Sequence, residues 1–299
     1  MSDKVVVALP DLANEFQHLQ RDEARAVGAR LGIEVEVLDA DRNAVLQIQQ
    51  LFKYIHAQGE KPRAMIVEPV AVEGMERVTQ KAAAAGIGVA LLNMVAGHLE
   101  TIRRQHAQVP IFTLGSDQIE IGRMQARQIR LLLPAGGTVL YIQGPTSHSA
   151  ARERVVGTQE VIAGTALRLV LIDALWTEES ADQVVRKWLR LKTTEGLRID
   201  LVACQDDAMA RGARRAFEAT PEITRQWGTV PYIGIDGVPS VGQRMVKEGQ
   251  LTATVVMPSN TGPALEAISR WLRSGTMPPS SIRVPISSFP AEDSLRPRG

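Results

Sequence analysis

The chain has 299 residues, a formal net charge of +1, a single cysteine and few aromatic residues. This length suffices for two domains with cores of their own, or for one large domain. The balanced charge, without a basic run, argues against nucleic-acid binding, and the lone Cys204 excludes an internal disulfide. No apolar run reaches the length of a membrane span.

The first third of the chain alternates between strands and helices. Strands are predicted at 5–9, 33–38, 64–67 and 88–92, and helices at 14–31, 43–57 and 72–85. This alternation is typical of a parallel sheet with right-handed crossovers. The polar segment 96–110 is expected to be a loop that interrupts it.

The alternation then restarts and runs almost to the end. Strands are predicted at 111–114, 138–142, 167–175, 201–204, 232–235 and 251–256, with a last strand at 282–286. Helices are predicted at 119–133, 149–163, 180–191, 208–219, 240–247 and 262–272. Two α/β halves followed by a strand-helix-strand tail indicate that the chain crosses between two domains more than once. Sheets whose carboxyl ends face each other would leave a ligand cleft.

One stretch carries the clearest signal for a binding site. A buried strand at 139–142 leads into the turn-forming residues 143–148, and Ser149 is expected to cap the helix that follows. Open α/β sheets place their binding groups where a strand, a polar loop and a helix N-terminus meet. Arg154, in this helix, can therefore point into a cleft.

Four motifs resemble one family along essentially the whole chain. They are SAARER at 149–154 with Gly157, DDAMA at 206–210, GIDG at 234–237, and LTATV at 251–255 with Pro258 and Gly262. The chain resembles the type I periplasmic binding proteins of the ribose- and galactose-binding group, whose fold lactose-repressor-type effector domains share. The resemblance implies an α/β fold of two doubly wound parallel-sheet lobes joined by a multi-strand hinge, with the ligand cleft between them. The implied lobes are 1–114 with 258–283, and 115–257 with 284–299.

The resemblance also implies which residues bind the ligand. Matching positions are Asn14, Phe16, Asn93, Arg154, Trp176, Asp206 and Asp236. Carboxylate, amide and guanidinium groups hydrogen-bond sugar hydroxyls, and aromatic rings cover the apolar C–H faces of a sugar. Simpler interpretations compete: an arginine on the helix surface, aromatic side chains in the core, a turn role for Asn93 and a helix cap at Asp236. Of the neighbours Asp206 and Asp207, we expect the first to bind ligand and the second to cap.

Three departures from the ribose-binding pattern bear on the ligand. Asn93-Met94 stands where the relatives carry Asp-Arg, Val256 or Met257 stands where they carry Gln, and Asp206 replaces a common Asn. The site loses polar groups and gains a carboxylate. These departures argue against ribose itself and are compatible with a smaller or less hydroxylated ligand, or with one that carries an amine.

No pattern in the sequence indicates an enzyme. The run Ser147-His148-Ser149 lacks a Gly-x-Ser-x-Gly elbow, so a structural loop is the better interpretation. The remaining histidines lack metal-ligand spacing, and no glycine-rich phosphate loop follows a strand. We therefore expect no catalytic residue, no cofactor and no metal.

The leading hypothesis is a solute-binding protein that captures a small sugar or polyol by hinge closure for the membrane permease of an ABC importer. The alternative is a ligand-sensing domain of a transcription regulator or a sensor-kinase receptor, with a signal that need not be a sugar. An enzyme on a similar α/β frame is the third hypothesis. The protein is expected to be a monomer in the periplasm with its leader trimmed, or cytoplasmic if Met1 is the native start.

Overall fold

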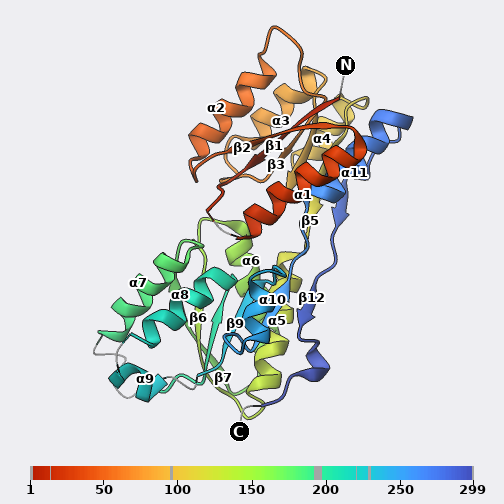
Figure 1. Ribbon diagram of the computed structural model, residues 1–299. Helices are drawn as coiled ribbons and strands as arrows, with labels where there is room; N and C mark the ends of the chain where they lie inside the picture. The colour runs from red at the N-terminus through yellow and green to blue at the C-terminus, as the bar shows by residue number, and fades with distance from the viewer. Residues whose placement is uncertain are drawn as a thin grey trace. The chain divides into compact units, whose positions relative to one another are not determined.

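The computed structural model describes residues 3–13, 15–94, 97–191, 197–219, 221–227 and 230–297. Two compact units emerge from the contacts: Met1–Ser116 with Ser259–Val284, and Asp117–Pro258 with Pro285–Gly299. The chain thus passes from one unit to the other after residues 116, 258 and 284. Each unit is a sheet covered by helices on both faces (Figure 1).

The sheet of the first unit has the strand order β11-β5-β4-β3-β1-β2, and all its neighbouring strands are parallel. Its strands are β1 (Lys4–Leu9), β2 (Glu34–Asp39), β3 (Ala64–Val67), β4 (Gly88–Leu92), β5 (Ile111–Gly115) and β11 (Ser281–Arg283). Its helices are α1 (Glu15–Leu31), α2 (Ala44–Ile55), α3 (Met75–Ala84), α4 (Leu99–Gln105) and α11 (Thr261–Ser274). Helices α1 and α11 cover one face, and α2, α3 and α4 cover the other.

The second unit repeats the arrangement with the order β12-β10-β9-β8-β6-β7, in which only the β10–β12 pair is antiparallel. Its strands are β6 (Gly137–Gln143), β7 (Leu167–Asp173), β8 (Leu201–Cys204), β9 (Tyr232–Asp236), β10 (Ala253–Val256) and β12 (Ser287–Phe289). Its helices are α5 (Gln118–Leu132), α6 (Ser149–Ile162), α7 (Glu178–Leu189), α8 (Asp207–Phe217), α9 (Pro221–Trp227) and α10 (Gly242–Lys247), with a 3-10 turn at Glu292–Ser294. Helices α7, α8 and α10 pack on one face, and α5 and α6 on the other.

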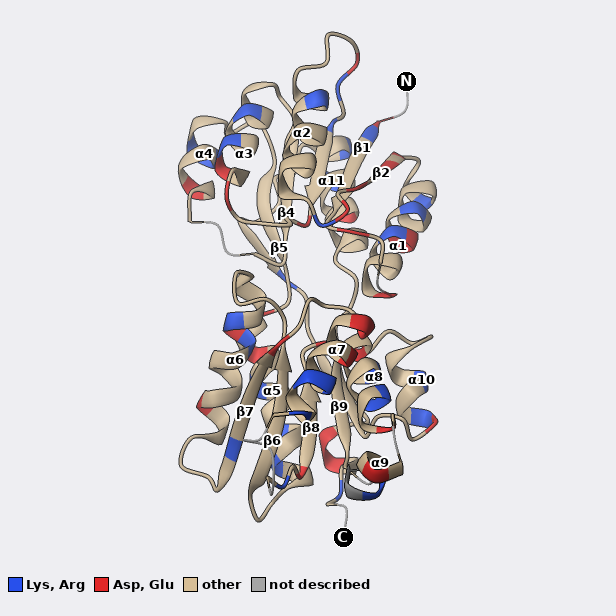
Figure 2. Ribbon diagram, turned by 90° about the vertical axis from the view of Figure 1, so that its left-hand side faces the viewer, with Lys and Arg blue, Asp and Glu red and all other residues tan. Residues whose placement is uncertain are grey.

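The predicted α/β class with two mainly parallel sheets is confirmed. The strands are nearly continuous apolar runs because helices bury both of their faces. The charged residues coloured in Figure 2 lie mostly on the helices and loops around the sheets. Each sheet gathers the carboxyl ends of its parallel strands at one edge, which is where such sheets place binding groups.

Three local predictions are wrong. The segment 96–110 contains helix α4, whose Leu99 and Ile102 are buried against the sheet. The expected last strand at 282–286 is two short strands, β11 and β12, one in each sheet. Ser149 does not cap α6: it is the first helical residue, and the N-cap position is His148, whose side chain makes no capping bond.

Glycines of α5 and α6 allow these two helices to pack with their backbones in contact. A side chain at Gly157 would collide with the carbonyl oxygen of Ile119, and one at Gly122 with the carbonyl oxygen of Arg154. This contact fixes α6, and with it Arg154, against α5. The glycine of the SAARER motif is therefore needed for helix packing.

We expect Gly157→Ala to lower the free energy of unfolding by about 1–3 kcal/mol, the usual cost of an added methyl group in a closely packed site. Urea denaturation measures this loss. Gly59→Ala is the control, because a side chain at Gly59 meets no atom within 4 Å. Equal stability of the two variants would contradict the close-packing argument.

Candidate functional site

Arg154 is buried at the carboxyl edge of the second sheet, with 5% of the residue exposed. Its Nε donates to Oε1 of Gln118 at 2.9 Å, and its Nη1 donates to the carbonyl oxygen of Gln205 at 2.6 Å. Its Nη2 lies 3.2 Å from the sulfur of Met257. These contacts hold the guanidinium in one orientation, so Arg154 is not a helix-surface arginine.

Trp176, just after β7, lies against Arg154. The guanidinium carbon of Arg154 is 5.6 Å from the centroid of the indole ring, within cation–π range. The indole Nε1 donates to Nδ1 of His148 at 3.0 Å. The ring also covers the backbone of Gly144, where any side chain would collide with it. The structure thus brings together two of the predicted residues from different strand ends.

The neighbouring carboxylates Asp206 and Asp207 differ from the sequence prediction. Asp206 caps α8 by accepting from the backbone N–H of Met209 at 2.5 Å, whereas Asp207 was expected to be the cap. Asp207 is buried and accepts from the backbone N–H of Gly237 at 2.8 Å and from the hydroxyl of Thr254 at 2.7 Å. Asp207 therefore connects α8 to β9 and β10.

Gln205, which the sequence interpretation missed, is fully buried beneath this edge. Its Oε1 accepts from the N–H of Gly144 at 3.0 Å, and its Nε2 donates to the carbonyl oxygen of Ala151 at 3.0 Å. Its own carbonyl oxygen accepts from Arg154. One side chain thus joins the loop after β6, the start of α6 and the end of β8.

Three of the predicted site residues have strained backbones. The φ angle is 52° at Asn93, 59° at Trp176 and 101° at Asp236. Among the described residues, only Asp41 and Arg42 are other non-glycine residues with positive φ. Each of the three stands at or just after the carboxyl end of a strand. Strain of this kind concentrates at functional sites, which makes these strand ends candidates independently of any motif.

In the first unit, Asn93 belongs to a hydrogen-bond network around Glu68. Asn93 Nδ2 donates to Oε1 of Glu68 at 2.9 Å, and the Nε2 atoms of Gln17 and Gln20 donate to its Oε2 at 3.2 and 2.9 Å. Asn93 Oδ1 accepts from Asn260 Nδ2 at 2.8 Å. Neutral amide groups thus surround a partly exposed carboxylate at the carboxyl edge of this sheet.

The sequence interpretation missed this network, although it offered one signal. Glu68 follows the fully buried strand β3 directly, and a charged residue at that position marks the edge where binding groups gather. Gln20 gave no such signal, because its partners Ser259 and Thr261 lie about 240 residues away. Phe16 is in the first turn of α1 with 6% exposed, and Asn14 lies outside the described residues.

Two titratable groups at the start of α6 have shifted pKa values. Burial lowers the pKa of His148, and the charge of Arg152 lowers it further. Burial raises the pKa of Glu153, with a smaller contribution from Asp117. A neutral imidazole is the form that can accept the indole hydrogen bond from Trp176 at neutral pH.

The part of the chain that the structure describes contains no group of three metal-ligating side chains. Within the same residues, no helix is long and apolar enough to cross a membrane.

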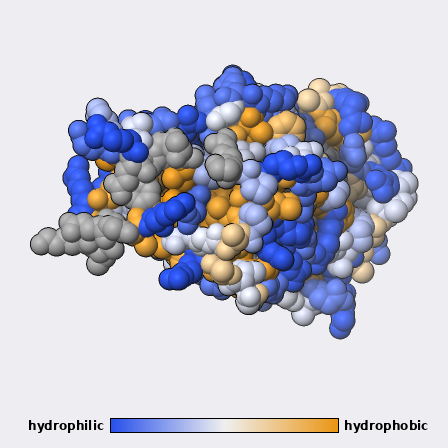
Figure 3. Space-filling view, turned by 90° about the horizontal axis from the view of Figure 1, so that it is seen from below, coloured by the Kyte–Doolittle hydropathy of each residue, from blue (hydrophilic) through white to orange (hydrophobic). Residues whose placement is uncertain are grey.

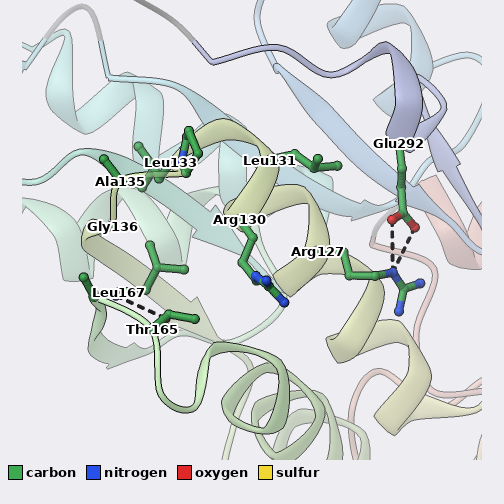
Figure 4. Close-up of a pocket in the computed structure, with 11 residues that line it drawn as sticks. Arg127, Arg130, Leu131, Leu133, Ala135, Gly136, Thr165, Leu167 and Glu292 are labelled. Carbon is green, nitrogen blue, oxygen red and sulfur yellow. Dashed lines mark hydrogen bonds and ion pairs between the residues drawn. The ribbon is translucent and has the colours of Figure 1, made fainter.

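A pocket of about 520 Å³ lies in the second unit, away from the candidate residues. Figure 4 shows it between the end of α5 and the amino ends of β6 and β7, beside the ion pair of Arg127 with Glu292. In the space-filling view of the molecule from below, groups of hydrophobic residues are visible between hydrophilic ones (Figure 3). None of the predicted site residues lines this pocket.

Comparison with known proteins identifies the family. The family model described as periplasmic binding protein domain matches residues 5–261. A putative rhizopine-binding protein of Rhizobium meliloti is 28% identical to this chain. The match covers 69% of this chain and 63% of that protein. The ribose import binding protein RbsB of Salmonella typhimurium is 25% identical over 87% of this chain and 81% of its own length.

A solved structure gives the same result for the fold. The Caulobacter myo-inositol binding protein bound to myo-inositol superposes with a TM-score of 0.80 and 26% identity, covering 96% of this chain and 92% of that one. The family match includes the strand ends after β1, β3, β4, β6, β7, β8 and β9, where the candidate residues lie. The resemblance inferred from the four motifs is confirmed: the chain belongs to the periplasmic binding protein domain family.

Proposed function

We propose that this protein is a solute-binding protein that captures a small sugar or polyol and delivers it to the membrane permease of an ABC importer. The observation that carries the proposal is the buried guanidinium of Arg154 held beside the indole ring of Trp176 at the carboxyl edge of a sheet. The relatives are named as a putative rhizopine-binding protein, a ribose import binding protein and a myo-inositol binding protein, and these names support the proposal. In this proposal the protein works in the periplasm.

The pairing suits the chemistry of a polyol. Hydroxyl groups point in fixed directions and take charge-assisted hydrogen bonds from a guanidinium or give them to a carboxylate such as Asp236. The C–H face of a ring or chain is apolar and packs on an indole. Closure of the two units over the ligand stays a prediction, as does direct ligand contact by each of the predicted residues.

In the first unit, Glu68 is proposed to select among ligands by their charge. Glu68 accepts hydrogen bonds from three neutral amides, so no cation of the described hydrogen-bond network neutralises it. A partly exposed carboxylate favours hydroxyl donors or an amine and disfavours carboxylate-bearing ligands. Neutral polyols and amino derivatives of sugars are therefore the preferred ligands, and sugar acids are not.

A thermal-unfolding screen tests the proposal. The panel contains pentoses, hexoses, inositols, linear polyols and nucleosides, with an amino sugar and a sugar acid as the charged pair. A ligand at about 100 times its dissociation constant stabilises the folded state by about 2.7 kcal/mol, which raises the Tm by several degrees. We expect at least one neutral polyol or amino derivative to raise the Tm, and the sugar acids to leave it unchanged.

A hit confined to nucleosides or sugar acids would contradict the proposed ligand class, and the absence of any hit would contradict the binding function as stated. The ligand should be recovered chemically unchanged after overnight incubation, because the proposal includes no reaction. Uptake of the labelled ligand by the source cells, with and without this protein, separates an importer subunit from a sensor domain.

A further inference from the structure

The hydrogen bond between Trp176 and His148 depends on the protonation state of the histidine. The indole N–H can only donate, so Nδ1 of His148 must carry a lone pair to accept it across 3.0 Å. The imidazole is then neutral, with its proton on Nε2. The two rings are also stacked, with centroids 6.2 Å apart and an angle of 27° between their planes.

Trp176 depends on such supports because its backbone is strained. Its φ angle of 59° is unfavourable for a bulky residue, and the surrounding contacts must maintain it. The indole rests on the backbone of Gly144 and on the guanidinium of Arg154. The bond to His148 is the polar contact that fixes the rotation of the ring.

We propose that His148 is a positioning residue, which holds the indole of Trp176 in its ligand-binding orientation and releases it when protonated. An imidazolium has a hydrogen on both ring nitrogens and cannot accept from the indole N–H. Ligand affinity then falls on the acidic side of neutrality. This inference rests on the proposed binding function, and it assigns to His148 a role beyond it.

The charges around the pair disfavour an imidazolium. His148 occupies the N-cap position of α6, where the helix dipole opposes positive charge, and Arg152 lies one turn further along. Arg154 adds a second cation, because its guanidinium lies over the indole ring of Trp176.

The acidic groups that flank Trp176 in the chain are engaged elsewhere. Asp173 accepts from Gln143 at 2.6 Å, Glu178 pairs with Arg211 and Arg215, and Glu179 accepts from Gln183 at 3.2 Å.

The direction of the pH effect follows from these surroundings. Burial, and then Arg152, lowers the pKa of His148 below its ordinary value of 6.5. The hydrogen bond is therefore fully formed above pH 6.5 and is lost as the pH falls through the lowered pKa of the folded state. As the pH falls from 7.5 through that lowered pKa, we expect affinity for a ligand found in the screen to fall about five- to tenfold, the contribution of one hydrogen bond.

Two variants of His148 distinguish a role in positioning Trp176 from a purely structural role. In His148→Asn the side-chain oxygen takes the place of Nδ1 and accepts from the indole but does not titrate, so affinity should stay near the pH 7.5 value of the wild type as the pH is lowered. In His148→Leu no acceptor remains, so affinity at pH 7.5 should already be about five- to tenfold below that of the wild type. Equal affinity of wild type and His148→Leu throughout the pH titration would overturn the inference while leaving ligand binding intact.

Fluorescence tests the inference without any ligand. The difference between the emission of the wild type and of Trp176→Phe isolates this indole from the other three tryptophans. The difference should titrate below pH 6.5 in the wild type and stay flat in His148→Asn and His148→Leu. The other four histidines lie within residues 1–116, in the other unit, so a titration that persists in both variants would contradict the assignment to His148.

Discussion

Replacing Arg154 with alanine is expected to weaken ligand binding by roughly 30-fold to 1,000-fold, which corresponds to about 2–4 kcal/mol. Arg154 is 5% exposed, and its guanidinium donates to Gln118 and to the carbonyl oxygen of Gln205. In the variant, the hydroxyl groups of the ligand lose a positively charged hydrogen-bond donor. The buried oxygens that accept from Arg154 lose this donor as well. Unpaired buried acceptors also lower the free energy of unfolding, by about 1–3 kcal/mol. Calorimetric titration at pH 7.5 measures the first effect, and urea denaturation measures the second.

Arg152→Ala is the matched control for this experiment. Arg152 is exposed, lies two residues earlier on the same helix, and donates only to the carbonyl oxygen of Thr146 among the described contacts. Its replacement should leave ligand affinity unchanged and alter stability by no more than about 0.5 kcal/mol. Arg154→Lys keeps the charge without the planar fork and should recover only part of the affinity. If Arg154→Ala is folded and binds like the wild type, the site proposed in the second unit is wrong.

Asp207→Ala is expected to lower the free energy of unfolding by about 3–5 kcal/mol, because it removes a buried acceptor of two charge-assisted hydrogen bonds. The carboxylate joins the N–H of Gly237 and the hydroxyl of Thr254, which come from two other parts of the sheet. Side chains at Gly234 and Gly242 would collide with its oxygens, so the surrounding backbone is closely fitted to it. Urea denaturation measures the loss.

The neighbouring variant Asp206→Ala is the comparison. Asp206 supplies a helix cap, whose loss costs about 1 kcal/mol, and it is the predicted ligand group of the pair. We expect the larger change in affinity for Asp206→Ala and the larger change in stability for Asp207→Ala. Equal losses of stability in the two variants would contradict this division of roles.

Much of the fold could be predicted from local patterns. Runs such as β1 and β3 are apolar throughout because they are buried on both faces, and the helices between them repeat their apolar residues at helical spacing. The two α/β units follow from this alternation. The short helix α4 escaped prediction because its segment is polar and has no capping side chain, and only packing of Leu99 and Ile102 defines it.

Within the site, the strand-loop-helix pattern in the sequence indicated Arg154, and the family resemblance added Trp176 and Asp236. Only the tertiary structure decided which groups these side chains contact. Adjacent carboxylates at a helix start look alike in sequence, and the distant partners Gly237 and Thr254 make Asp207 a structural group.

Partners that are distant in the sequence also explain why other contacts could not be predicted. Glu68 draws its amide donors from α1 and from the end of β4, and Trp176 meets His148 across 28 residues of chain. Local patterns record which face of an element is buried. Which polar group meets which depends on how the strand ends converge in the folded sheets.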